Sequence, residues 1–463
     1  MSATLMSQSY VASGEEPQVI GLATVGSVFL VTASAPSSKP APGNDKTLIR
    51  LTNGRLPGGR SVDVTVADGR IASVETAGET SASPSGADQV TDLGGWLVLP
   101  AMAEPHAHLD KALTAELVPN PTGDLIGAID AWVAAAGAGL ITHDDTVERA
   151  TAAMELLLVH GVTAVRTHVN VLGSTGASGV IAVKEAAARL DGLLDVQTVA
   201  LLSTPATGPE GAPVRQALTE AIEAGVDLVG GCPHLDPDSN GLIRLVLEAA
   251  TDAGLDVDLH VDEMLDPSVL TLRDLARQVI DSGFEHAVAA SHCVTLGMQS
   301  SAVQAAVSAE VAEAGIAVIT LPQTNLFLQG RDDPTATPRG LTAIAALAGA
   351  GVTVAGGGDN VQDPFNLVGR SDPLETAALL VMAGHRLPDD AYARVADHSR
   401  IALGMEPVAG PDGELRVGAP ADLVAIDAPS TRAAIADAPM ARRVFRRGRL
   451  VASADQQTGV HHP

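Results

Sequence analysis

Aromatic residues and cysteine are scarce in this chain of 463 residues: 2% of the residues are aromatic, and only Cys232 and Cys293 are cysteine. Two cysteines cannot form a disulfide framework, which favours a reducing compartment and predicts a cytoplasmic protein. The shortage of aromatic side chains removes the stacking platforms on which single-stranded nucleic acid binds. The core must therefore be aliphatic, and 46% hydrophobic residues supply enough material for it.

Positive charge is also in short supply, because 28 Lys and Arg face 55 Asp and Glu and leave a formal net charge of −27. Such a charge repels phosphate backbones and anionic lipid, so we expect neither a nucleic-acid nor a membrane partner. The triple glycine at 356–358 is not a phosphate loop, because no Gly-Lys-Ser/Thr follows it.

The composition of residues 1–45 predicts a poorly ordered N-terminal extension without catalytic residues. Residues 19–35 are nearly uncharged and end in Ala-Ser-Ala, as signal peptides do before their cleavage site. The residues before this run argue against export, since they include Glu15 and Glu16 but no Lys or Arg.

From residue 97 onward, short apolar runs alternate with stretches rich in alanine and leucine, the pattern of a parallel sheet built from βα units. The expected strands are Trp96–Ala103, Gly161–Val171, Val196–Ser203, Val226–Cys232, Leu255–Val261, His286–Ser291, Ile316–Leu321 and Val352–Ala355. Eight such strands predict an α/β fold, a (β/α)8 TIM barrel over residues 99–404.

Two polar segments with frequent glycines flank the barrel, residues 46–98 and 405–455. Each is too short to bury a core alone, so we expect them to pair into one small β-sandwich without catalytic groups. Asp68-Gly69 predicts a hairpin turn, and Arg447-Gly448 predicts a similar bend near the end of the chain.

Candidate metal ligands follow the expected strands, at the end of the barrel where catalytic groups gather. They are His106, His108, His260, His292 and Asp359. A His-X-His pair alone is weak evidence, but the ordered set is stronger. Neutral imidazoles suit zinc and iron, and a carboxylate completes a site with an open position for water. The set predicts a metal-dependent hydrolase.

Glu263 lies three residues after His260, where a ligand and a proton carrier can share one strand end. The alternative is a solvated loop acid or a helix cap, and Asp359 could likewise be an N-cap in an ordinary βα turn. Cys293 is interpreted as a buried spectator. The barrel mouth offers further polar residues that could contact substrate or serve as structural hydrogen-bonding groups: His168, Asn170, His234, Gln323, Asn325, Gln329 and Arg331.

Seven segments together resemble the cytosine deaminase-like branch of the amidohydrolase superfamily, which includes cytosine deaminases and N-isopropylammelide amidohydrolases. The segments are 104–110 (Glu-Pro-His-Ala-His-Leu-Asp), 166–169 (Arg-Thr-His-Val), 233–234 (Pro-His), 260–263 (His-Val-Asp-Glu), 291–292 (Ser-His), 328–331 (Leu-Gln-Gly-Arg) and 358–364 (Gly-Asp-Asn-Val-Gln-Asp-Pro).

The resemblance implies one divalent ion, zinc or iron, held by His106, His108, His260 and Asp359. His292 and Asp359 would activate the attacking water, and Glu263 would carry its proton to a ring nitrogen and then to the leaving amine. Strand four lacks the lysine that bridges two metals elsewhere in the superfamily, which favours a single ion. Family members often assemble, so a homo-oligomer is also compatible with the resemblance.

The expected substrate is a small aminated N-heterocycle, contacted by Ser203, His234, Gln329, Asn360 and Phe365. Ser203 stands where cytosine-specific enzymes carry a glutamine, and Phe365 stands where the bacterial ones carry tryptophan. Cytosine is therefore disfavoured against a related heterocycle or an N-alkylamino triazine. The alternative enzyme is a cyclic amide or amidine hydrolase. A catalytically silent metal-binding protein is the third hypothesis, and the presence of Glu263 argues against it.

Overall fold

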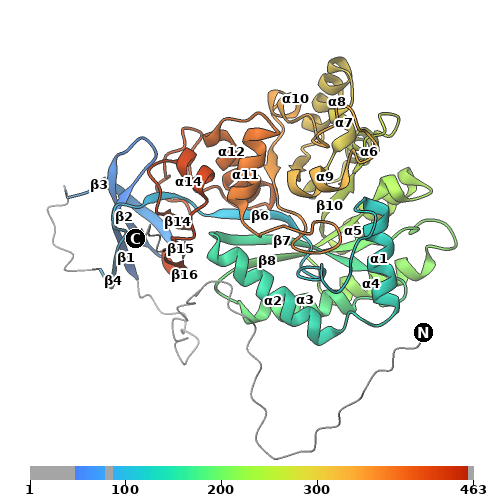
Figure 1. Ribbon diagram of the computed structural model, residues 1–463, viewed down its shortest axis with the longest axis horizontal. Coiled ribbons are helices and arrows are strands. Elements are labelled where there is room, and N and C mark those ends of the chain that lie inside the picture. Colours follow the sequence, from blue (N-terminus) through green and yellow to red (C-terminus); the bar gives the residue numbers. More distant parts are fainter. Residues whose placement is uncertain (1–46, 79–86, 457–463) are drawn as a thin grey trace, which may run out of the picture.

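The computed structural model describes residues 47–78 and 87–456. The predicted N-terminal extension, residues 1–45, lies outside them. The described chain forms a parallel barrel and a separate, mostly antiparallel sheet, and the strands of that sheet come from both ends of the chain (Figure 1).

Eight parallel strands follow one another around the barrel in chain order. They are β6 (Met102–Ala107), β7 (Val162–Val171), β8 (Asp195–Leu202), β9 (Leu228–Gly231), β10 (Asp256–Val261), β11 (Val288–His292), β12 (Ala317–Thr320) and β13 (Val354–Gly356). An isolated parallel bridge between Ala107 and Asp359 brings the first and last strands together. The predicted (β/α)8 barrel is confirmed.

Helices connect the strands and cover the outside of the barrel, with α2 and α3 beside β7 and β8 in Figure 1. The helices are α1 (Leu125–Gly137), α2 (His143–Val159), α3 (Ser178–Arg189), α4 (Ala212–Glu223), η1 (Pro233–Leu235), α5 (Ser239–Ala253), α6 (Thr271–Ser282), α7 (Val294–Gly297), α8 (Ser301–Glu313), α9 (Pro322–Leu328), α10 (Ile344–Gly349), α11 (Pro373–Met382), α12 (Pro388–Val395), α13 (Asp397–Ala402) and α14 (Thr431–Asp437). Thr142 and Ser300 cap α2 and α8 with their hydroxyls, while α5 and α6 end at Gly254 and Gly283 in the left-handed conformation. None of the described helices is long and apolar enough to cross a membrane.

The second sheet has the order β16-β15-β14-β5-β1-β2-β3, and β4 pairs with β1. Its strands are β1 (Leu48–Arg55), β2 (Ser61–Ala67), β3 (Arg70–Thr76), β4 (Gln89–Asp92), β5 (Leu97–Pro100), β14 (Leu423–Ile426), β15 (Arg442–Arg446) and β16 (Arg449–Ala454). Its own hydrophobic core includes Phe445. Asp68-Gly69 and Arg447-Gly448 both have positive φ and form the predicted hairpin turns.

The first predicted strand, Trp96–Ala103, was wrong, because it joins two strands of different sheets. β5 pairs with β1 and β14, whereas β6 begins at Met102 and pairs with β7. Residues 97–103 are all buried, so neither a polar residue nor an alternating pattern marks the change of sheet. As a result His106 lies within β6 and His108 just beyond it.

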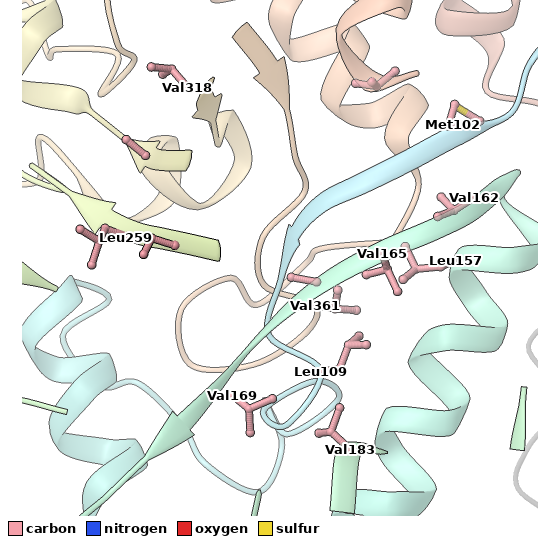
Figure 2. Packing of buried hydrophobic residues seen from close by; sticks show 14 of the residues in the cluster. Met102, Leu109, Leu157, Val162, Val165, Val169, Val183, Leu259, Val318 and Val361 are labelled. Carbon is pink, nitrogen blue, oxygen red and sulfur yellow. The ribbon is translucent and has the colours of Figure 1, made fainter. Parts of the chain in front are cut away.

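The barrel core is aliphatic, as the composition predicts. Figure 2 shows Leu157 of α2 against Val162 and Val165 of β7, with Met102 of β6 nearby. A buried ion pair joins the two parts of the molecule, because Arg442 of β15 donates to both carboxylate oxygens of Asp372 at 2.7 and 2.9 Å. Asp372 is also the N-cap of α11.

Candidate active site

Four predicted metal ligands converge at the carboxyl ends of the barrel strands. His108 Nε2 lies 3.1 Å from His260 Nε2. Asp359 Oδ1 lies 3.3 Å from His108 Nε2 and 3.5 Å from His106 Nε2. Two ligand atoms that are each about 2.1 Å from a tetrahedral ion lie roughly 3.4 Å apart. The spacing of these protein atoms therefore fits a single first-row metal ion.

The protonation of the histidines fits the same ion. Burial holds the pKa of His106 and His260 well below the ordinary value and lowers that of His108 to about 3, so all three imidazoles are neutral. His106 Nε2 is buried and makes no hydrogen bond to any described residue. The opposite ring nitrogens are occupied: His106 Nδ1 lies 2.8 Å from Ser291 Oγ, and His108 Nδ1 lies 3.1 Å from the His168 carbonyl. Such contacts fix the tautomer that offers Nε2 to a metal.

His168 lies closer to this cluster than the sequence predicted. Its ring centroid is 4.0 Å from that of His106, and one nitrogen of each of His106, His168 and His260 lies within 4.8 Å of the others. His106, His292 and Asp359 form a second group of this kind. His168 is therefore a further candidate ligand, whereas the sequence predicted only a contact with substrate or a structural hydrogen-bonding role for it.

Glu263 and His292 lie side by side, with Glu263 Oε1 3.5 Å from His292 Nδ1. Burial, with a contribution from Asp359, raises the pKa of Glu263 well above its ordinary value. Burial lowers the pKa of His292 to about 4. The carboxyl group is therefore a proton donor and the imidazole a proton acceptor, which suits general acid and base catalysis.

A buried carboxyl group holds the two ends of the barrel in register beneath this cluster. Glu104 on β6 accepts hydrogen bonds from the backbone N–H groups of His106 and Gly358, at 3.1 and 2.9 Å. Burial raises its pKa to about 8. Since Asp359 follows Gly358, these bonds set the separation of His106 and Asp359.

The cluster opens into a cavity of about 140 Å³. Its polar end is formed by His108, Lys111, His260, Glu263, His292 and Asp359, and its apolar wall by Leu125, Ile129, Val133, Leu172, Leu201, Leu202 and Leu235. Of the predicted substrate contacts, Ser203, Asn360 and Phe365 line the cavity.

Two predicted substrate contacts, His234 and Gln329, are not among the described residues that line the cavity. Gln329 donates its side-chain amide to the Glu263 carbonyl at 3.0 Å, so it holds the loop that carries the acid. His234 lies on η1, and burial lowers its pKa to about 4.

Sequence reasoning missed the wall formed by α1 and the position of Lys111. Helix α1 is apolar on nearly every side, so its sequence lacks the polar face that marks a surface helix. The signal that could have found Lys111 is its place in the run His-Ala-His-Leu-Asp-Lys, three residues after a ligand.

Comparison with known proteins agrees with this arrangement. Residues 142–452 match the amidohydrolase family. A pterin deaminase from Rhizobium rhizogenes is 33% identical over 423 residues, which cover 88% of this chain and 91% of that protein. The structure of 5-methylcytosine deaminase from Klebsiella pneumoniae superposes with a TM-score of 0.78 at 29% identity, over 89% of this chain and 99% of that one. N-isopropylammelide isopropylaminohydrolase from Burkholderia multivorans gives a TM-score of 0.73 at 27% identity, over 88% and 98%.

The barrel and the cluster at its carboxyl end define a hydrolase that acts on carbon–nitrogen bonds other than peptide bonds. The chain belongs to the amidohydrolase family, in its cytosine deaminase-like branch.

Proposed function

We propose that this protein is a metal-dependent hydrolytic deaminase of a small aminated N-heterocycle. The observation that carries the proposal is Glu263, a buried acid that faces the same cavity as the ligand cluster without belonging to it. A protein that only bound a metal would need no such acid.

The proposed ligands are His106, His108, His260 and Asp359, and a single zinc or iron ion is favoured. When bound, the ion would lower the pKa of water and polarise the reacting carbon. Asp359 and the neutral imidazole of His292 are placed to accept the proton of the attacking water. Glu263 gives its proton to the ring nitrogen, takes up the proton that Asp359 and His292 received from the water, and donates that proton to the departing amine.

The relatives support a heterocyclic substrate, since the names of three of them refer to pterin, to 5-methylcytosine and to N-isopropylammelide. The 33% identity to the pterin deaminase makes a 2-amino-4-oxo heterocycle the first candidate. Ser203 in the cavity wall cannot present the paired donor and acceptor of a glutamine, which disfavours cytosine itself.

The test is ammonia and amine release by the metal-loaded protein with pterin, isocytosine, cytosine, ammelide and N-alkylamino triazines. We expect release from at least one compound and none from Asp359→Asn. A ring-opened acid as product would show cyclic-amide hydrolysis instead, and no release from the whole panel by protein with its metal bound would overturn the proposal.

A further inference from the structure

Lys111 is a buried cation in the wall of the cavity, and the roles assigned above do not use it. Its side chain is 3% exposed. Its Nζ lies 3.0 Å from His108 Nδ1 and 3.4 Å from Asp110 Oδ1. The rings of Trp132 and Phe365 lie 5.7 and 5.8 Å from Nζ, so its remaining surroundings are largely aromatic.

The hydrogen bonds of His108 leave this ammonium group short of acceptors. His108 Nε2 points to the ligand cluster, so the ring proton is on Nδ1, where it is donated to the His168 carbonyl. A protonated Nδ1 cannot accept from Lys111. Asp110 Oδ1 is then the one acceptor that the described residues offer to an ammonium group with three donors. Two N–H donors remain for a molecule in the cavity.

The charges around the cavity restrict what that molecule can be. Lys111 is the one lysine or arginine among the described residues that line it, while Glu263 and Asp359 line the same end. A phosphate or carboxylate would face both acids with a single cation to offset them. A carbonyl oxygen, or the delocalised anion of a deprotonated lactam, needs only the donors that Lys111 has available. The leucines and the α1 side chains in the cavity wall suit the unsubstituted edge of a ring system.

We propose that Lys111 is a specificity-determining residue that donates a hydrogen bond to an oxo oxygen of the substrate. It thereby selects amino-oxo heterocycles over their analogues without the oxygen. The inference rests on the proposed function. It assigns recognition of the carbonyl oxygen to Lys111 on the loop after β6, because Ser203 at the end of β8 has no side-chain amide that could donate to this oxygen.

The experiment measures binding of pterin and of 2-aminopteridine, which lacks the oxygen, by fluorescence titration. Protein carrying Glu263→Gln is used so that turnover does not interfere. Adding Lys111→Met should weaken pterin binding about tenfold to a hundredfold, the range for a lost hydrogen bond to a charged group, and should leave 2-aminopteridine binding nearly unchanged. Lys111→Gln keeps a neutral donor and should restore part of the pterin affinity.

Metal content and thermal unfolding confirm that each variant is folded and loaded, and Lys111→Gln decides the matter if Lys111→Met does not fold. Equal weakening of both ligands would show a merely structural role. Unchanged pterin binding, or no pterin binding by the parent protein, would overturn the inference. The proposed function is tested separately, by ammonia release from the wider panel with protein that has native Lys111 and Glu263. The binding results for the Lys111 variants do not affect that test.

Discussion

At the scale of single residues, the site contains a cluster of proposed metal ligands and one acid that lies outside this cluster. Ligand atoms lie 3.1–3.5 Å apart in three pairs, which are His108–His260, His108–Asp359 and His106–Asp359. Glu263 instead lies 3.5 Å from His292 and faces the cavity. Removing the acid should therefore affect the reaction, whereas removing a ligand should affect the metal.

We predict that Glu263→Gln keeps its metal and loses turnover by about a hundredfold to ten-thousandfold, the usual contribution of a positioned acid or base. His106→Ala should lose both, because it removes one of the four proposed ligands. Metal analysis of the purified variants beside ammonia release checks both statements. Equal metal loss in the two variants would contradict the assigned roles.

The convergence of His106, His108, His260 and Asp359 could be predicted from the sequence because each comes at or near the end of a strand, and parallel strands bring their carboxyl ends together. Lys111 and His168 could not be assigned in the same way. The contact of Lys111 with the cavity depends on the fold of the 108–111 turn. The approach of His168 to the ligand cluster depends on the packing of its ring against His106.

At the scale of elements, two adjacent glycines of β9 have different surroundings. A Cβ on Gly230 would lie 2.3 Å from the Asp258 carbonyl oxygen of β10, the strand that carries His260. A Cβ on Gly231 would find its nearest atom, on Leu242, at an ordinary 3.5 Å. The first glycine is therefore required by close backbone packing and the second is not.

We predict that Gly230→Ala lowers the free energy of unfolding by about 1–3 kcal/mol through overpacking and also weakens metal binding, since β10 must move. Gly231→Ala is the matched control and should change both little. Chemical denaturation and chelator competition measure the two quantities. Wild-type behaviour of Gly230→Ala would show that β10 does not have this close contact.

The ion pair between β15 and the start of α11 holds the second sheet to the barrel. Burial raises the pKa of Asp372, but Arg442 outweighs that effect and holds it below the ordinary value. The depressed pKa means that the stabilisation is present above the ordinary aspartate pKa and is lost as the pH falls through the folded one.

We predict that Arg442→Met destabilises the protein by about 3–5 kcal/mol at neutral pH, because it leaves the Asp372 carboxylate buried without its partner. The control is Arg60→Met, which removes an exposed pair with Glu414 and should cost at most about 1 kcal/mol. Thermal unfolding compares the two variants, and similar effects would show that the buried pair has no special weight.

The types of most elements could be predicted, since seven of the eight predicted barrel strands overlap the observed ones closely. The boundary between β5 and β6 could not, because both strands are buried and the apolar run continues through them. Helix α1 was missed because an apolar helix over a cavity has no polar face to reveal its period.

At the scale of the whole molecule, residues from strands far apart in the sequence form the site only when the barrel is closed. An ion shared by residues in or directly after β6, β10 and β13 should bind the folded protein and not the unfolded chain. Its binding must then stabilise the entire barrel.

We predict that zinc at a hundred times its dissociation constant raises the free energy of unfolding by about 2.7 kcal/mol over metal-free protein. A chelator should reverse the gain, and the His106→Ala variant should show little of it. Thermal unfolding with and without metal measures the effect. An equal gain in the His106→Ala variant would show that the metal binds elsewhere.

The central claim is that one metal ion in this barrel drives deamination, and the most direct test is to titrate metal into metal-free protein while measuring ammonia release. The account predicts no release without metal and a linear rise that saturates at one equivalent per chain. Full activity in the metal-free protein, or saturation only at two equivalents, would contradict it.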